Sequence, residues 1–252
     1  MSNASENTII RAKGLKRYYR RGSETVKALD GVDLDIHAGE MVSILGPSGS
    51  GKTTLVNLLS CLDAPTEGSL CVSGREVAGL SEDQLAEVRR GNMGFVFQKF
   101  YLLPTLTVAE NVELSLMFCR RPVKRAATME VLRQVGLADR ASHLPRELSG
   151  GQMQRAAIAR ALIVEPKILI ADEPTGNLDS QNGEAIFALF RSLVADRGLT
   201  MIVTTHNLAF GYLADRVFTL HDGRIVKEEP GHGHSALGVP AHAVASLAGA
   251  VA

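Results

Sequence analysis

The sequence predicts an α/β protein with a mainly parallel sheet, and two observations support this. Short apolar runs alternate along the chain with segments of helical periodicity, as in strand–helix–strand units. The runs are mostly apolar and lack the polar alternation of a half-exposed strand, which fits strands in a sheet that is covered on both faces. The predicted strands are 41–45, 95–97, 168–171, 201–205 and 216–220, and the predicted helices are 53–60, 124–135, 152–163, 181–196 and 207–213.

The first forty residues follow a different pattern. The segments IIRAKGLKRYY and GVDLDI are typical of two strands in an antiparallel meander that precedes the first α/β unit. The segment 99–147 is predicted to be mostly helical. We therefore expect an N-terminal β region and a helical region around the parallel sheet.

The composition is typical of a globular protein and disfavours several classes of function. Hydrophobic residues make up 45% and charged residues 21%, which argues against bulk disorder. The 27 Lys and Arg residues balance the 27 Asp and Glu residues, which disfavours a basic nucleic-acid face. The three cysteines form no CxxC pair, which disfavours a zinc ribbon or a disulfide framework and suits a reducing cytosol.

Neither a secretion signal nor a membrane span is predicted. The first eleven residues are polar and contain no apolar signal core. No run of about 18 apolar residues occurs, which is the length that a spanning helix needs. If the protein acts at a membrane, we expect another chain to supply the spans.

A glycine-rich segment between the strand 41–45 and the helix 53–60 matches GxxxxGK[ST], in the context that a phosphate-binding loop requires. Its glycines let successive N–H groups face one point, toward which the helix directs its positive end. Lys52 is expected to reach the β- and γ-phosphates, and the Thr53 hydroxyl to hold Mg²⁺. The predicted nucleotide-binding residues here are Gly46, Pro47, Ser48, Gly49, Ser50, Gly51, Lys52, Thr53 and Thr54.

Two carboxylates follow the apolar strand 168–171. Unpaired charge at the end of a buried strand is costly, so Asp172 and Glu173 need a reason to be there. Asp172 fits a Mg²⁺ ligand, and Glu173 fits a carboxylate that polarises the attacking water. The alternative is a surface turn with two solvated acids, which the phosphate loop upstream disfavours.

The segment Leu148-Ser149-Gly150-Gly151-Gln152 resembles the signature of ABC-type ATPases. Ser149, Gly150 and Gly151 stand at the start of a predicted helix, which suits anion binding. In the family this surface, with Gln152, meets the γ-phosphate of ATP held by the other subunit. The resemblance implies a P-loop NTPase of ABC type, with a mainly parallel sheet core, an N-terminal antiparallel β subdomain and an inserted α-helical subdomain.

Four more residues resemble family elements in the expected order. Tyr19 matches the aromatic residue that stacks on adenine, although Tyr18 is adjacent and stays an alternative. Gln98 matches the glutamine that contacts Mg²⁺ and water. Asp179 lies in the segment NLDS and is expected at the dimer interface, and His206 matches the switch that contacts the γ-phosphate.

The resemblance covers residues 8–229, with the α-helical subdomain at about 99–165. Residues 230–252 have no counterpart and form a tail rich in Gly, Ala, Pro and His. We interpret it as an appendage without a ligand, with weak metal binding by His232 and His234 as the alternative. The residues 100–103 (Phe-Tyr-Leu-Leu) suit either docking of a partner or a place in the core.

The resemblance implies an ATPase whose complete site needs two copies of the chain, paired head to tail around two MgATP. The expected catalytic residues are Glu173, His206, Gln98 and Lys52. The expected Mg²⁺ ligands are Thr53, Gln98 and Asp172. A protein with a dead site is disfavoured, because every one of these positions is filled.

Further segments, among them LDAPTEG and ADEPTGNLD, resemble the group of the macrolide exporter ATPase MacB, the lipoprotein-release ATPase LolD and the cell-division ATPase FtsE. This implies a permease partner with few membrane spans and a large extracytoplasmic domain. It also implies a place on the cytoplasmic face of the inner membrane. The alternative is a soluble ABC ATPase of the DNA-repair or translation type, disfavoured by the short gap between phosphate loop and signature and by the lone cassette.

Overall fold

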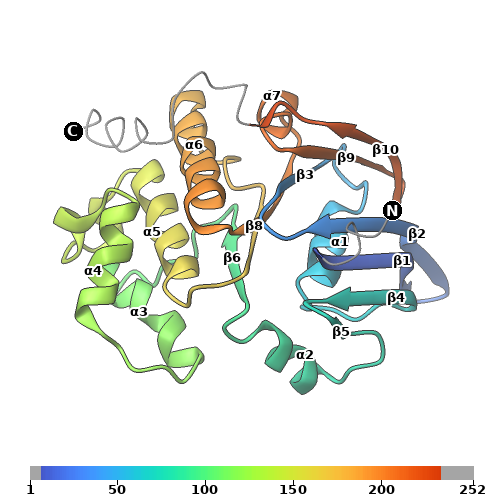
Figure 1. Ribbon diagram of the computed structural model, residues 1–252, viewed down its shortest axis with the longest axis horizontal. Coiled ribbons are helices and arrows are strands. Elements are labelled where there is room, and N and C mark those ends of the chain that lie inside the picture. The colour runs from blue at the N-terminus through green and yellow to red at the C-terminus, as the bar shows by residue number, and fades with distance from the viewer. Residues whose placement is uncertain (1–6, 234–252) are drawn as a thin grey trace. The chain divides into compact units, whose positions relative to one another are not determined.

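The computed structural model describes residues 7–233, which fall into two compact units (Figure 1). The first unit contains the chain up to Arg90 and the segment Ile202–Gly233. The second unit contains Gly91–Met201. The chain passes between them after Arg90 and again within the strand β8 (Thr200–Thr205). Each unit is described below by itself.

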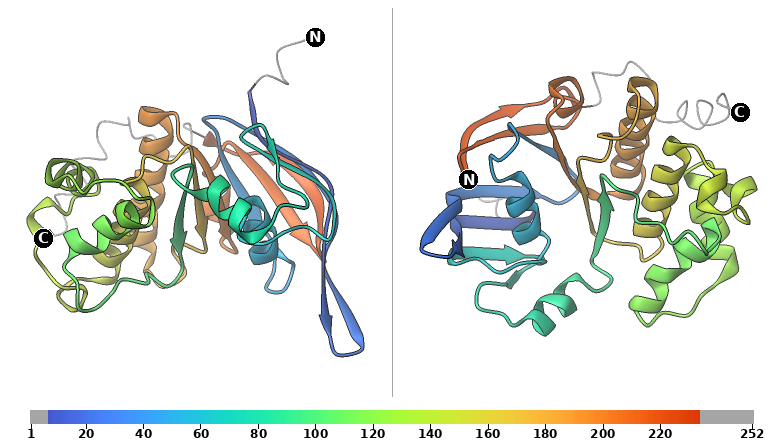
Figure 2. Two further views of the ribbon diagram at one scale, coloured as in Figure 1. Left: turned by 90° about the horizontal axis from the view of Figure 1, so that it is seen from below. Right: turned by 180° about the vertical axis from the view of Figure 1, so that it is seen from behind.

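An antiparallel sheet forms one part of the first unit, in the strand order β2-β1-β4-β5. It confirms the predicted N-terminal meander, although its first two strands are longer than expected and form an extended ribbon (Figure 2). Gly22 turns the chain between them with a φ of 61°. The elements are β1 (Thr8–Arg21), β2 (Glu24–His37), β4 (Glu67–Val72) and β5 (Arg75–Glu76), followed by the helix α2 (Glu82–Arg89).

Parallel pairing forms the other part of the first unit. The strand β3 is buried along its whole length and pairs in parallel with β9, which pairs antiparallel with β10. The helix α1 follows β3 and contacts β2. The elements are β3 (Met41–Leu45), α1 (Lys52–Leu59), α7 (Leu208–Gly211), β9 (Arg216–His221) and β10 (Arg224–Pro230).

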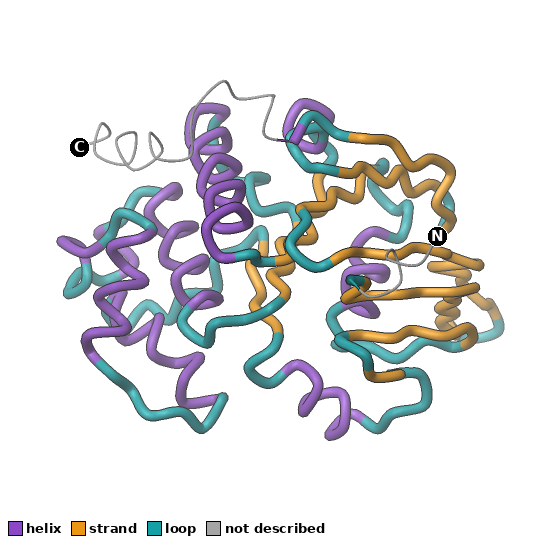
Figure 3. The backbone as a smooth tube through the Cα atoms, in the orientation of Figure 1, coloured by secondary structure: helices purple, strands orange, loops and turns teal. Residues whose placement is uncertain are grey.

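The second unit combines a parallel strand pair with packed helices (Figure 3). Its strand β6 approaches the helix α5 closely, since a Cβ added to Gly94 would lie 2.8 Å from the Ala161 carbonyl oxygen. The helices α3, α4 and α5 contact one another, and α6 contacts α5. The elements are β6 (Met93–Phe97), α3 (Val108–Phe118), α4 (Arg125–Gln134), α5 (Gly150–Leu162), β7 (Ile168–Asp172) and α6 (Ser180–Arg197).

The apolar runs and helical patterns predicted from the sequence match elements of the structure, so the predicted α/β class is confirmed. The last predicted helix, at 207–213, is shorter than expected: Asn207 caps the start of α7, and the helix ends at Gly211. The strand β10 was not predicted, and it includes Pro230, where the tail was expected to begin. His234 and the rest of that tail lie outside the described residues.

The described residues contain no helix with the length and apolar character that crossing a membrane requires.

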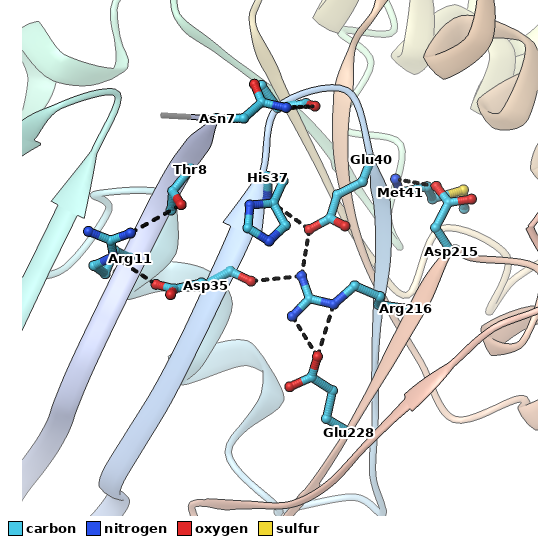
Figure 4. Close-up of polar contacts among 11 residues, drawn as sticks. Asn7, Thr8, Arg11, Asp35, His37, Glu40, Met41, Asp215, Arg216 and Glu228 are labelled. Carbon is cyan, nitrogen blue, oxygen red and sulfur yellow. Dashed lines mark hydrogen bonds and ion pairs between the residues drawn. The ribbon is translucent and has the colours of Figure 1, made fainter. Parts of the chain in front are cut away.

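Arg216 ties the two parts of the first unit together (Figure 4). Its guanidinium donates to the Asp35 carbonyl oxygen at 2.9 Å, to Glu40 Oε1 at 2.7 Å and to Glu228 Oε1 at 2.6 Å. Glu40 also accepts the backbone N–H of His37 at 2.7 Å and is 15% exposed. Removing the guanidinium therefore leaves a mostly buried carboxylate without its cation.

We expect Arg216→Met to lower the free energy of unfolding by about 1–3 kcal/mol, because Glu40 loses a charged partner in a poorly solvated place. Urea denaturation followed by circular dichroism measures this. Arg90→Ala is the matched control, since Arg90 pairs with Glu87 at the surface and such pairs contribute less than about 1 kcal/mol. Equal losses in the two variants would contradict the structural role assigned to Arg216.

Candidate active site

The phosphate loop of the first unit connects β3 to α1. Gly49 and Gly51 have φ values of 81° and 104°, which L-residues other than glycine rarely adopt. The Lys52 ammonium donates to the carbonyl oxygens of Gly46 at 2.8 Å and Pro47 at 3.0 Å, so its side chain folds back across the loop. The amides at the start of α1 lack intrahelical acceptors, as at every helix start. The loop has the shape that a phosphate-binding turn needs.

Two glycines let this loop pack against its neighbours. A Cβ added to Gly46 would lie 2.3 Å from the Leu220 carbonyl oxygen, and one added to Gly51 would lie 2.5 Å from that of Ala28. The Ser50 carbonyl oxygen accepts the N–H of Gly223 at 2.9 Å. The hydroxyl of Thr53 is on an exposed residue in the first turn of α1, and Thr54 follows it. Pro47 and Ser48 are exposed at the tip of the loop.

The other candidates in the first unit are His206 and the two adjacent tyrosines. His206 is exposed and directly follows β8. Tyr18 and Tyr19 are neighbours on β1, so their side chains point to opposite faces. The Tyr18 hydroxyl donates to Asp30 at 2.5 Å, and this bond raises the pKa of Tyr18. The Tyr19 hydroxyl donates to Asp63 at 2.9 Å.

In the second unit two neighbouring parallel strands place polar residues at their carboxyl ends. Phe97 of β6 lies opposite Asp172 of β7, so Gln98 and Glu173 directly follow the ends of two adjacent strands. Asp172 and Glu173 are both half-buried. Glu173 has a φ of 49°, a left-handed conformation that is uncommon for residues other than glycine. The strand pair therefore brings an amide and two carboxylates to one edge.

The loop after Glu173 holds Gln98 in place. The Asn177 side chain donates to the Gln98 carbonyl oxygen at 2.8 Å. A Cβ added to Gly176 would lie 2.6 Å from Gln98 Nε2, so glycine is required for the glutamine amide to lie where it does. Asn177 is the first residue of the segment NLDS. Its contact with Gln98, which is 79 positions away, could not be predicted from any sequence pattern.

The signature residues form the start of α5. Ser149 caps this helix, since its hydroxyl accepts the N–H of Gln152 at 3.3 Å and the Gln152 side chain accepts the N–H of Ser149 at 2.9 Å. Gly150 has room for a side chain, because an added Cβ would make an ordinary contact at 3.4 Å from Leu178 Cδ2. Gly151 faces Asn182, and an added Cβ would lie 2.4 Å from Asn182 Oδ1.

Asp179 has a role that the sequence analysis did not foresee, because it caps α6. Its carboxylate accepts the backbone N–H and the side-chain amide of Asn182, both at 2.8 Å. These hydrogen bonds lower the pKa of Asp179. Asn182 thus connects the start of α6 to Gly151 at the start of α5. The spacing of Asp179 and Asn182 is that of a helix cap and its third residue, which is a recognisable signal.

Arg160 of α5 was also missed, and no local pattern marks it. Its guanidinium donates to the carbonyl oxygens of Phe100 at 2.9 Å and Tyr101 at 2.5 Å. Burial lowers the pKa of Arg160. Tyr101 and Leu103 are 63% and 47% exposed, so these two side chains are not core residues. The helix that begins with the signature therefore also holds the segment after Gln98.

The donor types fit Mg²⁺ bound to a phosphate chain. Thr53, Asp172 and Gln98 offer a hydroxyl, a carboxylate and an amide oxygen, and Mg²⁺ prefers such hard oxygen ligands. No group of three or more His, Cys, Asp or Glu side chains with metal-binding geometry occurs among residues 7–233. Mg²⁺ in nucleotide sites is held by one or two carboxylates together with phosphates and water, so such a group is not required.

The comparisons with known proteins agree on one family. The model of the family described as "ABC transporter" matches residues 29–176. The macrolide export ATP-binding/permease protein MacB of Salmonella typhimurium is 47% identical over 218 residues, which are 86% of this chain and 34% of MacB. The chain thus spans about a third of the length of the MacB relatives that it matches.

A second relative matches along nearly its whole length. The uncharacterized ABC transporter ATP-binding protein MJ0796 of Methanocaldococcus jannaschii is 45% identical over 227 residues, covering 88% of this chain and 97% of that protein. A solved dimeric structure of MJ0796 in a post-hydrolysis state, bound to ADP and Pi, has a TM-score of 0.81 and 43% identity, covering 88% and 98% of the two chains. The chain therefore belongs to the ABC transporter family, of which it is an ATPase domain.

Proposed function

We propose that two copies of this chain pair around two MgATP, hydrolyse ATP and thereby drive a membrane permease of the MacB/LolD type. The observation that carries the proposal is the phosphate loop, with its left-handed glycines and the lysine folded across it. The dimeric structures of MJ0796, one of them with ADP and Pi, support the pairing.

The first unit supplies the groups that bind the triphosphate. Backbone N–H groups of Gly49, Ser50 and Gly51 donate to phosphate oxygens at the positive end of α1, and Ser50 gives up its 3.3 Å hydrogen bond to the Pro47 carbonyl oxygen to do so. Lys52 exchanges its two carbonyl contacts for the β- and γ-phosphates, which is favourable because a charged acceptor replaces neutral ones. Tyr19 stacks on the base, and His206 contacts the γ-phosphate.

The second unit supplies the groups that act on the water. Glu173 accepts a hydrogen bond from the attacking water and takes its proton as the water oxygen bonds to the γ-phosphorus and the bond from that phosphorus to the bridging oxygen of ADP breaks. Gln98 orients the same water, and Asn177 and Gly176 fix its position. Thr53, Asp172 and Gln98 would hold Mg²⁺, which supplies charge stabilisation of the transferred phosphoryl group.

The signature acts on the nucleotide of the second copy. Ser149 and the N–H groups of Gly150 and Gly151 form a helix start that suits a γ-phosphate. Asp179 and Gln152 already serve as a cap and a capping-box partner in one copy, so they hold this surface in shape. Hydrolysis removes the γ-phosphate that joins the two copies, and the pair opens.

The permease is assigned by similarity. The MacB relatives carry "ATP-binding/permease" in their name, and they are 45–47% identical to this chain over the matched region. We propose that the chain lies at the cytoplasmic face of the inner membrane, held there by a permease with few spans and a large extracytoplasmic domain. Tyr101 and Leu103, exposed beside Gln98, suit a contact with that partner.

Glu173→Gln is expected to bind ATP and dimerise but to lower the hydrolysis rate by about 10²–10⁴-fold, because the amide cannot accept the proton. Phosphate release and size-exclusion chromatography with MgATP measure the two properties. Glu165→Gln is the matched control, since Glu165 is exposed and also has a positive φ, 51°. Hydrolysis near the wild-type rate in Glu173→Gln would remove Glu173 from this role.

A pull-down from native membranes tests the permease. Glu173→Gln with MgATP is expected to hold the closed pair and its partner, and mass spectrometry identifies what is recovered. We expect a permease with few spans and a large external domain. Recovery of ribosomal or nucleic-acid-binding proteins alone would refute the transport assignment and leave the ATPase assignment standing.

Gly151→Ala is expected to lower the free energy of unfolding by about 1–3 kcal/mol, because the new Cβ overlaps Asn182 Oδ1. Gly150→Ala is the matched control, since its Cβ makes an ordinary contact with Leu178. Thermal or urea denaturation of the two variants provides the comparison. If Gly151→Ala were as stable as Gly150→Ala, the close packing of α5 on α6 would not be a constraint.

A further inference from the structure

Three side chains of the first unit form a closed cluster around Tyr19. Arg17 and Tyr19 are two residues apart on β1 and therefore lie on the same face. The Arg17 guanidinium lies 4.7 Å from the centroid of the Tyr19 ring. Arg17 also binds the Asp63 carboxylate with two nitrogens, at 2.9 Å and 2.8 Å, and the Tyr19 hydroxyl donates to the same carboxylate at 2.9 Å.

This cluster fixes the ring and leaves part of it accessible. The hydroxyl contact fixes one end of the tyrosine, and the guanidinium covers one face. Tyr19 is nevertheless 36% exposed, so the ring is not enclosed by the protein. Tyr18 makes contacts of the same kind, since its hydroxyl donates to Asp30 and the Lys27 ammonium lies 5.4 Å from its ring centroid. It differs from Tyr19 in being less exposed.

Asp63 connects the cluster to the phosphate loop through α1. The backbone N–H groups of Leu62 and Asp63 both donate to the Asn57 carbonyl oxygen, at 2.8 Å and 3.1 Å. The same helix begins at Lys52, so one rigid element carries the phosphate loop at its start and the Asp63 carboxylate just beyond its end. The distance between the phosphate loop and the Tyr19 ring is thereby set by this helix.

We propose that Arg17 and Asp63 are positioning residues that hold the Tyr19 ring as a platform for the nucleotide base. Arg17 occupies one face of the ring, and the base stacks on the other. This inference rests on the proposed function, since it assigns residues to the base end of the same nucleotide site. It predicts that Arg17 contributes to binding through the base and not through the phosphates.

Calorimetric titration with ATP and with inorganic tripolyphosphate, both with Mg²⁺, separates these contributions. We expect Arg17→Ala to weaken ATP binding about two- to fivefold, the size of an exposed cation–π contact, and to leave tripolyphosphate binding unchanged. Arg17→Lys, which keeps a cation but loses the two-pronged contact with Asp63, is expected to fall between. Lys16→Ala is the matched control, because Lys16 is next to Arg17 on β1 and pairs with Glu67 of β4.

A double-variant cycle tests whether Arg17 acts through the tyrosine. In a Tyr19→Leu background, where base stacking worth about five- to a hundredfold is already lost, Arg17→Ala is expected to have no further effect on ATP binding. An effect that persists there, an equal loss for tripolyphosphate, or tighter ATP binding by Arg17→Ala would overturn the inference alone. Wild-type protein that bound neither ligand would overturn the proposed function as well.

Discussion

Close backbone approach at two glycines is the constraint on which the site of the second unit depends. Gly176 leaves room for the Gln98 amide, and Gly151 leaves room for Asn182. Between these two contacts the loop after Glu173 also donates from Asn177 to Gln98. Because dense packing transmits small displacements, a shift of this loop moves both the glutamine and the start of the signature helix. The geometry thus couples Gln98, which we propose orients the water, to the signature surface, which we propose contacts the nucleotide of the second copy.

The polar groups of the site have second tasks in the fold, and these tasks fix their geometry. Asp179 and Ser149 satisfy amides at helix starts that would otherwise lack acceptors. The Lys52 ammonium donates hydrogen bonds to two loop carbonyl oxygens, and the Arg160 guanidinium donates to two carbonyl oxygens in the segment after Gln98. A side chain held by such contacts loses little conformational freedom when a ligand arrives, which is the general advantage of preorganised sites.

Local sequence patterns predicted most helices and strands, but they could not predict side-chain contacts between residues that are far apart in the sequence. The strand β3 was predicted with its observed bounds, because a run with four apolar residues out of five ends at a glycine-rich turn. The phosphate loop and the signature were found because each is contiguous in sequence. Arg160 and the pairing of Arg17 with Asp63 were not, since their partners lie 60 and 46 positions away and no periodicity links them. The strand β10, mostly polar and exposed, also lacked an apolar pattern.

The motifs follow the carboxyl ends of strands, and this placement explains why they carry strain. Parallel strands end in loops that must expose N–H groups and side chains, as open α/β sheets do where they bind ligands. The phosphate loop follows β3, Gln98 follows β6 and Glu173 follows β7. At Glu173 the chain must turn at once after a strand that ends in Asp172, and a φ of 49° is the result. A glycine would relieve that strain but would remove the carboxylate, so the chemistry and the backbone make opposing demands at this residue. The strained conformation is held in place from both sides. Before Glu173 the strand β7 is paired with β6, and after it the Gly176 N–H donates to the Glu173 carbonyl oxygen.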